Sequence, residues 1–544
     1  MKKLKWLLAA TLTVTLLAGC SSSGGSSDTV TLMVDADLMS MDSGVATDGT
    51  SFAMIQACID GLYGYDKDGN LELALAEKEE ISDDGLVYTY TLRDVNWSNG
   101  DPVTANDFVY SWRRLITNAS EYTFLLGPEG ANVKNYTDIM AGKKDIKELG
   151  IVAKDDKTVE VTLESPVAFA NQIFAFPVLF PINEKYCEEL GDQYGLTPEN
   201  LLYCGAYKLV NWEKGAKVDL VKNEDYYDAE DVKTENLTVL LSPDLSAAAV
   251  QFDNGDLDFT IINSSLIDQY QDSDSMKSIA GGFLWYLQPD DGNEDLENLN
   301  IRKGISAAID REDFVNNILK DGSIVPTGYH PHDLSTSPSG TDFADDCGDL
   351  LAKNGNSYDL AKAQEYIDAG LKELGKDSIT FTLMYGDDEG SATEAATYVK
   401  NALDKLKGVN CELSSTQKKS RLDTMKTATF DCAVHRWGPD FGDPTTYLNN
   451  MQHSQWGTDE YPDGNNNYGH YFNPEYDKLM AQARAETDLA KRWDLLIQCN
   501  EILMADLPII PLYEKNQAVL QNPDLKGLIN NPTGTPWIYK YVEK

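Results

Sequence analysis

An alternation of apolar strands and helices over residues 379–434 constrains the fold of this chain more than any other feature. The pattern predicts strands at residues 379–385, 409–413 and 430–434, with a helix at residues 392–406 and a shorter one near residues 420–425. Strands joined by crossover helices run in the same direction and build a parallel sheet. The sequence therefore predicts an α/β fold.

The third strand leads into Gly438, Pro439 and Asp440, residue types that end a strand and turn the backbone. Parallel sheets bind ligands beyond the carboxyl ends of their strands, so we expect this turn on a ligand-facing rim. Gly438 has no Cβ and would let the backbone of a guest come close. Pro439 fixes its own φ and has no N–H. In the simpler interpretation, Asp440 caps the turn and Trp437 belongs to the core.

The stretch 430–451, FDCAVHRWGPDFGDPTTYLNNM, resembles the oligopeptide-binding proteins of ABC importers, the extracellular solute-binding proteins of family 5. In that family a Trp-x-x-Asp follows a strand of the larger lobe. The resemblance implies that Asp440 holds the ammonium group of a bound peptide and that Trp437 lines the cavity. It also places Gly438, with Pro439 beside it, in a backbone segment that pairs with the peptide like an added strand.

The resemblance extends over residues 30–541 and implies further site residues. A second backbone edge against the peptide is expected at Thr47, Asp48 and Gly49. A cavity-lining tyrosine corresponds to Tyr122. Two more tryptophans are expected near the site: Trp285, in the crossover FLWYL into the second lobe, and Trp537, in the C-terminal tail. Residues 288–293, QPDDGN, depart from the family pattern, so no site residue is carried onto them.

The fold that the resemblance implies is a two-lobed, type II periplasmic-binding-protein-like α/β fold with an extra subdomain on the first lobe. The expected segments are a signal peptide at 1–19, a tether at 20–29, the first lobe at 30–59, 183–281 and 509–544, the extra α/β subdomain at 60–182, and the second lobe at 282–508.

The N-terminus has the pattern of a bacterial export signal. Residues 1–20, MKKLKWLLAATLTVTLLAGC, combine three lysines with an apolar run that is too short to span a membrane as a helix. The ending Leu-Ala-Gly-Cys resembles a lipobox and predicts lipidation at Cys20. The following SSSGGSS is a flexible tether. We therefore expect an extracytoplasmic protein held to the membrane through its lipid only, on the outer surface of a single-membrane bacterium or on the periplasmic face otherwise.

The charge balance excludes nucleic acid as a partner. The chain has a formal charge of −43, and removal of residues 1–19, with three lysines and no acids, takes it to −46. Phosphate binding needs clustered lysine and arginine. A solvated acidic surface accounts for the composition, and attraction of cationic ligands is a second interpretation. The hydrophobic content of 42% is enough for a large core.

The number and spacing of the cysteines suggest one disulfide bond as a hypothesis. Beyond Cys20 the chain has seven, an odd number, and no CxxC motif. Cys187 and Cys204 bracket a loop with turn-forming glycines and a proline, and both lie outside strong helical periodicity. Exported proteins form disulfides, so the sequence predicts a bond between these two.

Sequence motifs for catalysis or metal binding are missing. The chain has neither the GxSxG motif of a nucleophile elbow nor the HExxH motif of a zinc helix. His330 and His332 could form half of a metal site, but with five histidines in the chain a solvent-exposed loop is the favoured interpretation. We expect no metal, no cofactor and no enzymatic activity.

These features together predict a monomeric lipoprotein that captures oligopeptides in a closing cleft and delivers them to the permease and ATPase subunits of an ABC importer. Main-chain bonds would give affinity for many peptide sequences. Two alternatives stay open. The same fold could bind a dipeptide, a peptide pheromone, or a nickel or haem ligand, and an extracytoplasmic hydrolase is a hypothesis from another class.

The lipidation at Cys20 is testable by substitution. Because stable anchoring needs two or more acyl chains, we expect Cys20→Ser to release the protein into the medium or periplasm. Immunoblots of membrane and soluble fractions after a high-salt wash measure this. A Cys20→Ser protein that stays with the membranes would contradict the assignment.

Overall fold

The computed structural model describes residues 29–34, 36–241, 244–457 and 466–544. The predicted signal peptide, Cys20 and the tether up to residue 28 lie outside these residues. Thr29 already belongs to the first strand, β1.

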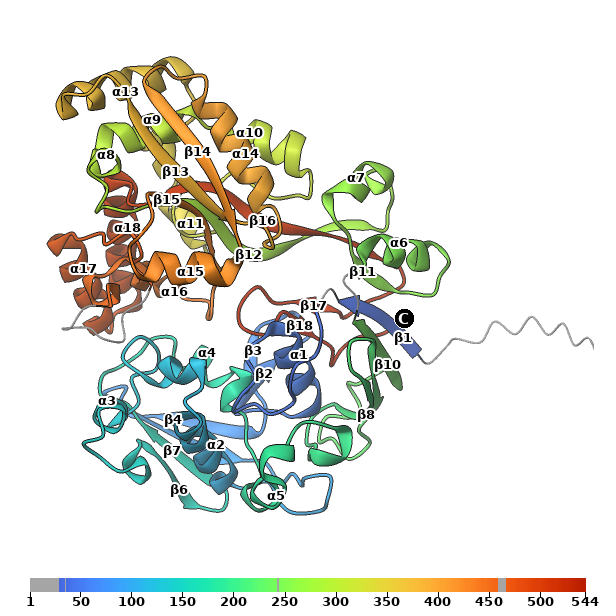
Figure 1. Ribbon diagram of the computed structural model, residues 1–544. Helices are drawn as coiled ribbons and strands as arrows, with labels where there is room; N and C mark the ends of the chain where they lie inside the picture. Colours follow the sequence, from blue (N-terminus) through green and yellow to red (C-terminus); the bar gives the residue numbers. More distant parts are fainter. Residues whose placement is uncertain (1–28, 35, 242–243, 458–465) are drawn as a thin grey trace, which may run out of the picture.

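One ten-stranded mixed sheet runs through the molecule (Figure 1). In spatial order its strands are β14 (Val409–Thr416), β13 (Ile379–Gly386), β15 (Cys432–Trp437), β12 (Met276–Pro289), β16 (Ile510–Gln521), β11 (Phe259–Ile261), β1 (Thr29–Val34), β10 (Asn236–Leu241), β9 (Lys217–Lys222) and β8 (Tyr207–Glu213). The predicted parallel unit is confirmed, because β13 pairs in parallel with both β14 and β15.

The two long antiparallel strands β12 and β16 connect the two lobes (Figure 1). The first half of β12 pairs with the end of β16 near β11, and its second half pairs with the start of β16 and with β15. The register shifts between Ala280 and Phe283, where Gly281 and Gly282 interrupt the pairing. A bulge of this kind bends the strands at the point where the chain passes from one lobe to the other.

The strand before the predicted turn is longer than the sequence pattern indicated. It runs to Trp437 because residues 432–437 all pair with β12, and it begins only at Cys432. Asp431, just before it, accepts a hydrogen bond from the Thr382 backbone N–H at 2.8 Å. Its side chain thus replaces a ladder contact at the start of β15.

Helices cover the second lobe on both faces of its strands (Figure 1). α14 packs on β13 and β14, and α15 packs on β13. The helices of this lobe are α8 (Glu294–Glu297), α9 (Leu299–Ala308), α10 (Arg311–Asp313), α11 (Phe343–Cys347), α12 (Leu350–Lys353), α13 (Leu360–Leu374), α14 (Ala392–Leu403), α15 (Lys418–Lys426), α16 (Thr445–Leu448), α17 (Pro474–Ala485) and α18 (Leu489–Asp506). Within the described ranges, no helix is both long and apolar enough to cross a membrane.

A separate four-stranded antiparallel sheet lies within residues 76–162, in the order β4 (Ala76–Ile81), β5 (Val87–Leu92), β7 (Thr158–Thr162) and β6 (Ile151–Asp155). Helix α2 (Ala105–Thr117) packs on β6 and β7. Asp107 and Thr104 form a capping box at its N-terminus, which satisfies backbone N–H groups that a helix start leaves free. This sheet lies in the segment that the resemblance assigns to the extra subdomain.

The remaining elements complete the first lobe. They are α1 (Gly49–Cys58), α3 (Tyr136–Met140), α4 (Ala170–Phe174), α5 (Glu184–Leu190), α6 (Leu245–Asp253), α7 (Ser264–Tyr270), the hairpin β2 (Tyr63–Tyr65) and β3 (Leu71–Leu73), and the ribbon β17 (Ile529–Asn530) and β18 (Trp537–Ile538). Buried apolar residues form one large cluster in this part of the chain and a second within residues 284–513. The predicted lobe boundary after residue 281 falls inside β12, and the one after residue 508 falls just before β16.

The two lobes touch through aromatic and charged contacts. Phe169 of the first lobe stacks on Phe441 of the second with ring centroids 4.6 Å apart. Arg484 Nη2 lies 3.3 Å from a carboxylate oxygen of Glu129. The structure is therefore a conformation in which the lobes are in contact around the segment that follows Asp440.

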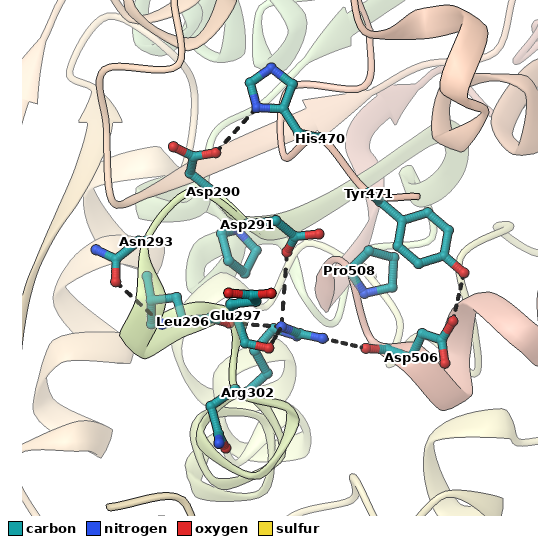
Figure 2. Close-up of polar contacts among 12 residues, drawn as sticks. Asp290, Asp291, Asn293, Leu296, Glu297, Arg302, His470, Tyr471, Asp506 and Pro508 are labelled. Carbon is teal, nitrogen blue, oxygen red and sulfur yellow. Dashed lines mark hydrogen bonds and ion pairs between the residues drawn. The ribbon is translucent and has the colours of Figure 1, made fainter. Parts of the chain in front are cut away.

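Residues 288–293, which end β12 and begin the turn after it, lie next to the helices of the second lobe (Figure 2). Arg302 Nη1 donates to the Leu296 carbonyl at 2.8 Å, and its Nη2 donates to the Asp506 carbonyl at 2.8 Å. The same guanidinium lies 3.9 Å from the Asp291 carboxylate. These contacts give the segment that departs from the family pattern a structural role.

The predicted disulfide between Cys187 and Cys204 is wrong, because both are separate, buried thiols. Cys187 lies in α5 and hydrogen-bonds with Tyr110, so it does occupy a helical core position. Cys204 packs elsewhere, and its backbone N–H donates to the Cys58 carbonyl at 3.2 Å. The loop between the two cysteines is closed by backbone hydrogen bonds, such as the one from the Gly195 N–H to the Asn200 carbonyl at 2.9 Å.

These thiols generate a prediction for chemical modification. We expect Cys187 and Cys204 to be alkylated in denaturant without any reductant, and only slowly in the folded protein, because burial raises the pKa of both thiols. Peptide mass spectrometry measures the labelling. A disulfide-linked peptide that contains both cysteines would contradict the structure.

Candidate functional site

Strand β15 carries the central segment of the site to the rim of the sheet. Its last residue, Trp437, pairs with Leu284 of β12, and the turn to Asp440 follows. The parallel strands β13 and β14 end at the same edge, at Gly386 and Thr416. Because binding sites form at the carboxyl ends of parallel strands, this rim is the candidate site.

Hydrogen bonds hold the turn in one conformation. Trp437 Nε1 donates to the Thr446 carbonyl at 2.8 Å, and the Asp440 backbone N–H donates to Thr446 Oγ1 at 2.9 Å. The Tyr447 hydroxyl lies 2.5 Å from the Gly282 carbonyl and 3.0 Å from the Trp437 carbonyl, which ties the turn to the bulge in β12. The position of Asp440 is therefore set before any ligand arrives.

The glycine in this turn is required by the protein itself. A Cβ at Gly438 would lie 2.3 Å from a ring carbon of Phe283, closer than side chains approach one another. Pro439 is buried and its Cγ would lie 3.1 Å from a Cβ at Gly282. The close approach of a guest backbone to Gly438 stays a prediction. The structure adds a second reason for glycine at this position, which is the packing of the Phe283 ring against it.

The carboxylate of Asp440 is half-buried and has no counter-ion. Removal from water raises its pKa to about 7, and neither a charge nor a hydrogen bond from the described residues lowers it. A cation that binds next to an ionised carboxylate shielded from water stabilises the charged form of that carboxylate. The site is therefore suited to a protonated amine.

Residues of the first lobe lie opposite Asp440. Burial, and then the negative charges of Asp440, Glu121 and Asp48, raise the pKa of the Tyr122 hydroxyl, so these groups lie close to one another. The Tyr122 ring packs on Phe52 at 5.3 Å and on Phe176 at 5.2 Å between centroids. These aromatic rings form an apolar wall next to the carboxylate.

The start of α1 and the C-terminal tail also lie near the turn that carries Asp440. Asp48 caps α1 by accepting hydrogen bonds from the Ser51 backbone N–H at 2.8 Å and its hydroxyl at 2.7 Å. A Cβ at Gly49 would lie 3.0 Å from Pro536, and one at Gly534 would lie 3.6 Å from the Asp440 carbonyl. The structure thus brings Asp48, Gly49 and Tyr122 together with the turn at 437–440.

The structure gives the three other predicted site residues different surroundings. Trp285 is only 3% exposed and stacks on Tyr513 with centroids 5.6 Å apart, so its ring belongs to the core of the second lobe. Trp537 packs on Phe259 at 4.9 Å and lines a pocket with Asp60, beyond the C-terminal end of α1. Thr47 is exposed.

Sequence analysis missed three residues next to the site: Phe176, Phe283 and Arg436. Phe176 and Phe283 come from distant parts of the chain, so only the fold could place them. Arg436 directly precedes Trp437 on β15, and a cation near the end of a mostly apolar strand was a signal that the sequence contained.

The histidine motif is not a solvent-exposed loop, so that interpretation is wrong. His330 is fully buried, lies 3.0 Å from Ser335 Oγ, and has its pKa lowered to about 3 by burial. His332 Nδ1 lies 3.0 Å from the Glu514 carboxylate, and this contact raises the pKa of His332 to about 9. Among the described residues, no three metal-ligating side chains are gathered into a cluster.

The model of the bacterial extracellular solute-binding proteins, family 5, matches residues 70–459 of the chain. The chain belongs to this family. A dipeptide-binding protein of Lactococcus lactis is 30% identical over 547 residues, covering 96% of each chain. DppE of Bacillus subtilis, a dipeptide-binding protein, is 29% identical over 514 residues, or 91% of this chain and 88% of that one.

Solved structures of this solute-binding family show the same two-lobed fold. The structure titled "Listeria monocytogenes OppA bound to peptide" aligns with a TM-score of 0.76 at 34% identity, covering 95% of this chain and 99% of that one. Haemophilus influenzae OppA in complex with RPPGFSPFR aligns with a TM-score of 0.75 at 26% identity, covering 95% and 97%. The predicted α/β fold of two lobes is confirmed.

The packing of Gly438 gives a prediction for stability. We expect Gly438→Ala to destabilise the protein by roughly 1–3 kcal/mol, because the new methyl group overlaps the Phe283 ring. Adding Phe283→Leu should recover part of the loss, since the smaller side chain leaves room. Thermal unfolding of the single and double variants measures this. Two losses that simply add would contradict the steric explanation.

The raised pKa of Asp440 gives a prediction for pH dependence. The folded-state pKa of about 7 lies above the unfolded value near 4, so this group favours folding at low pH and its contribution is lost as pH rises toward 7. Asp440→Asn should therefore stabilise the ligand-free protein at pH 8, by roughly 2–4 kcal/mol, and change little at pH 4. Denaturant unfolding at both pH values measures the difference. An equal effect at pH 4 and pH 8 would contradict it.

Proposed function

We propose that this solute-binding protein captures peptides between its lobes and that Asp440 binds their α-amine. The observation that carries the proposal is the preformed, half-buried carboxylate without a counter-ion at the rim of the parallel sheet. An α-amine has an ordinary pKa near 8, so a free peptide arrives with a positive charge at neutral pH. The charge of Asp440 then compensates the charge of the guest in a place shielded from water.

The backbone around the anchor supports a peptide more than a compact solute. Trp437 ends a strand whose outer neighbours stop at the same rim, so an extended guest can continue the strand pattern with main-chain hydrogen bonds. The apolar wall of Phe52, Tyr122 and Phe176 offers surface for side chains without specific polar demands. Relatives of similar identity named as oligopeptide-binding and dipeptide-binding proteins support the same ligand class.

A dipeptide is the second candidate ligand, because two relatives that cover 91% and 96% of this chain are named for dipeptides. Both candidates use the same amine anchor and differ in the length of the guest. A titration with alanine peptides of increasing length separates them.

The rest of the proposed role extends beyond the candidate site. The protein acts as a monomer without catalytic activity, and it delivers its ligand to the permease and ATPase subunits of an ABC importer. A lipid on Cys20 holds it at the outside of the cell membrane, where the acidic surface keeps it soluble. The nucleic-acid-binding classes stay excluded by the shortage of clustered cations.

The amine anchor is testable with paired peptides. Removing one partner of a buried charge pair costs ~2–5 kcal/mol, so Asp440→Ala should weaken binding of a free-amine peptide by roughly 30-fold or more. The same peptide with an acetylated N-terminus should bind wild type poorly, and the variant should discriminate far less between the two. Isothermal titration calorimetry measures all four combinations.

The matched control is Glu121→Gln, which removes an exposed negative charge close to Tyr122 and leaves Asp440 in place. It should keep the preference for the free amine. A folded Asp440→Ala protein with an unchanged ratio of free to acetylated affinity would show that Asp440 only stabilises its turn.

A further inference from the structure

One aromatic side chain of the first lobe, Phe169, lies at the centre of the contact between the two lobes. Its ring stacks on Phe441 of the second lobe, with centroids 4.6 Å apart and ring planes 10° from parallel. The guanidinium carbon of Arg492, from α18, lies 5.4 Å from the centre of the same ring. Phe169 is only 7% exposed. Buried aromatic side chains at the centre of a contact commonly carry most of its binding energy.

The slot that receives Phe169 is built by the second lobe alone. Arg492 Nη1 and Nη2 donate to the two carboxylate oxygens of Asp443 at 2.6 Å and 2.8 Å, and both side chains are buried. Asp443 also accepts hydrogen bonds from the Thr445 backbone N–H at 3.0 Å and from its hydroxyl at 2.6 Å. Because these contacts lie within one lobe, the slot is preorganised for the ring.

A charged pair forms the rim of this contact. Arg484 Nη2, from α17, lies 3.3 Å from the Glu129 carboxylate of the first lobe and 3.3 Å from Asn449 Oδ1. The turn that carries Glu129 is tight, because a Cβ at Gly130 would lie 2.2 Å from the Leu125 carbonyl oxygen. A partly exposed polar rim around a buried aromatic centre is the anatomy of a reversible interface.

The contact joins two bodies that are otherwise packed separately. Phe441 packs with the buried apolar cluster of the first lobe, although its neighbours in the chain belong to the second. Next to it, a Cβ at Gly442 would lie 3.1 Å from Gln172 Oε1 of α4, so the glycine lets α4 come close. Since each lobe has its own large apolar cluster, the contact can open while both cores stay intact.

Both halves of the contact are continuous with the candidate site. Phe441 directly follows Asp440 in the chain. On the other side, the short 3₁₀ helix that carries Tyr122 leads into the turn with Glu129. Because the same two chain segments build the site and the contact, closing the lobes on a guest at Asp440 brings Phe169 into its slot in the same movement.

We propose that Phe169 in its slot and the Glu129–Arg484 pair form a clasp that sets the lifetime of the closed protein. This inference rests on the proposed function and deepens it. The clasp does not touch the guest, so it adds the same free energy to the binding of every peptide, whereas Asp440 recognises the amine. Affinity falls when the closed, binding-competent state is less populated, whatever the guest is.

Dissociation rates and affinities for three guests test the clasp: tri-alanine, penta-alanine and Ala-Phe-Ala. Phe169→Ala should weaken binding of all three by the same factor, roughly 30-fold or more, through faster dissociation and with association nearly unchanged. Phe169→Leu keeps apolar bulk without the stacked ring and should cost a smaller, again uniform, factor; it carries the test if the alanine variant does not fold. Stopped-flow fluorescence and calorimetry measure the rates and affinities, and circular dichroism checks folding.

A double-mutant cycle tests the rim. Glu129→Gln and Arg484→Gln should each weaken binding by roughly two- to fivefold, the range of partly exposed ion pairs. The double variant should lose no more than the weaker single one, because the pair is broken only once. Lys478→Gln is the matched control: this exposed cation of α17 pairs with Glu475 of its own lobe at 3.1 Å, and its removal should leave all three affinities as in wild type.

Losses that differ strongly among the three peptides would show that these side chains contact the guest, and would overturn the clasp. Unchanged dissociation rates in a folded Phe169 variant, or losses that simply add in the double variant of the rim, would overturn it as well, while peptide binding by wild type stands. If wild type binds none of the peptides, the proposed function itself is overturned, and the inference with it.

Discussion

Backbone pairing between β12 and its antiparallel neighbours β15 and β16 sets the position of the turn that carries Asp440. β12 aligns Trp437 with Leu284, and the bulge at Gly281 and Gly282 lets the strand bend from one lobe to the other. The Tyr447 hydroxyl then joins the bulge to the turn that leads to Asp440. A carboxylate placed in this way is held by the fold and needs no ligand to order it.

A carboxylate without a counter-ion follows from this arrangement. Asp440 has no close partner of opposite charge among the described residues, whereas Arg436 lies 3.6 Å from the carboxylate of Glu389. Because hydrogen bonds hold the turn in one conformation, the Asp440 carboxylate is positioned without a ligand.

The sequence was sufficient for the features that depend on local pattern. The strand and helix alternation over 379–434 predicted the parallel unit, and Gly438 to Asp440 predicted the rim turn, because glycine and proline after an apolar strand stop the ladder and turn the chain. It could not show which aromatic rings surround Asp440, since Phe52, Tyr122 and Phe176 meet only through tertiary packing.

Two predictions failed because their deciding contacts are not local. The disulfide prediction failed because α5 is too short to show a clear helical periodicity in the sequence. Cys187 was therefore assigned to a loop, whereas it lies in the core. The prediction for the histidines failed for a related reason, since Glu514, the partner of His332, is far away in the chain.

Proton release on ligand binding tests the central claim most directly. With a pKa of about 7, Asp440 is protonated in the ligand-free protein at pH 6, whereas a peptide amine is already charged. Formation of the ion pair must then expel the proton from Asp440. Calorimetry at pH 6 in buffers of different ionisation enthalpy should therefore show release of nearly one proton per free-amine peptide bound, and none from this site in Asp440→Asn. Proton uptake, or the same release in wild type and in Asp440→Asn, would contradict the assignment of Asp440 as the amine anchor.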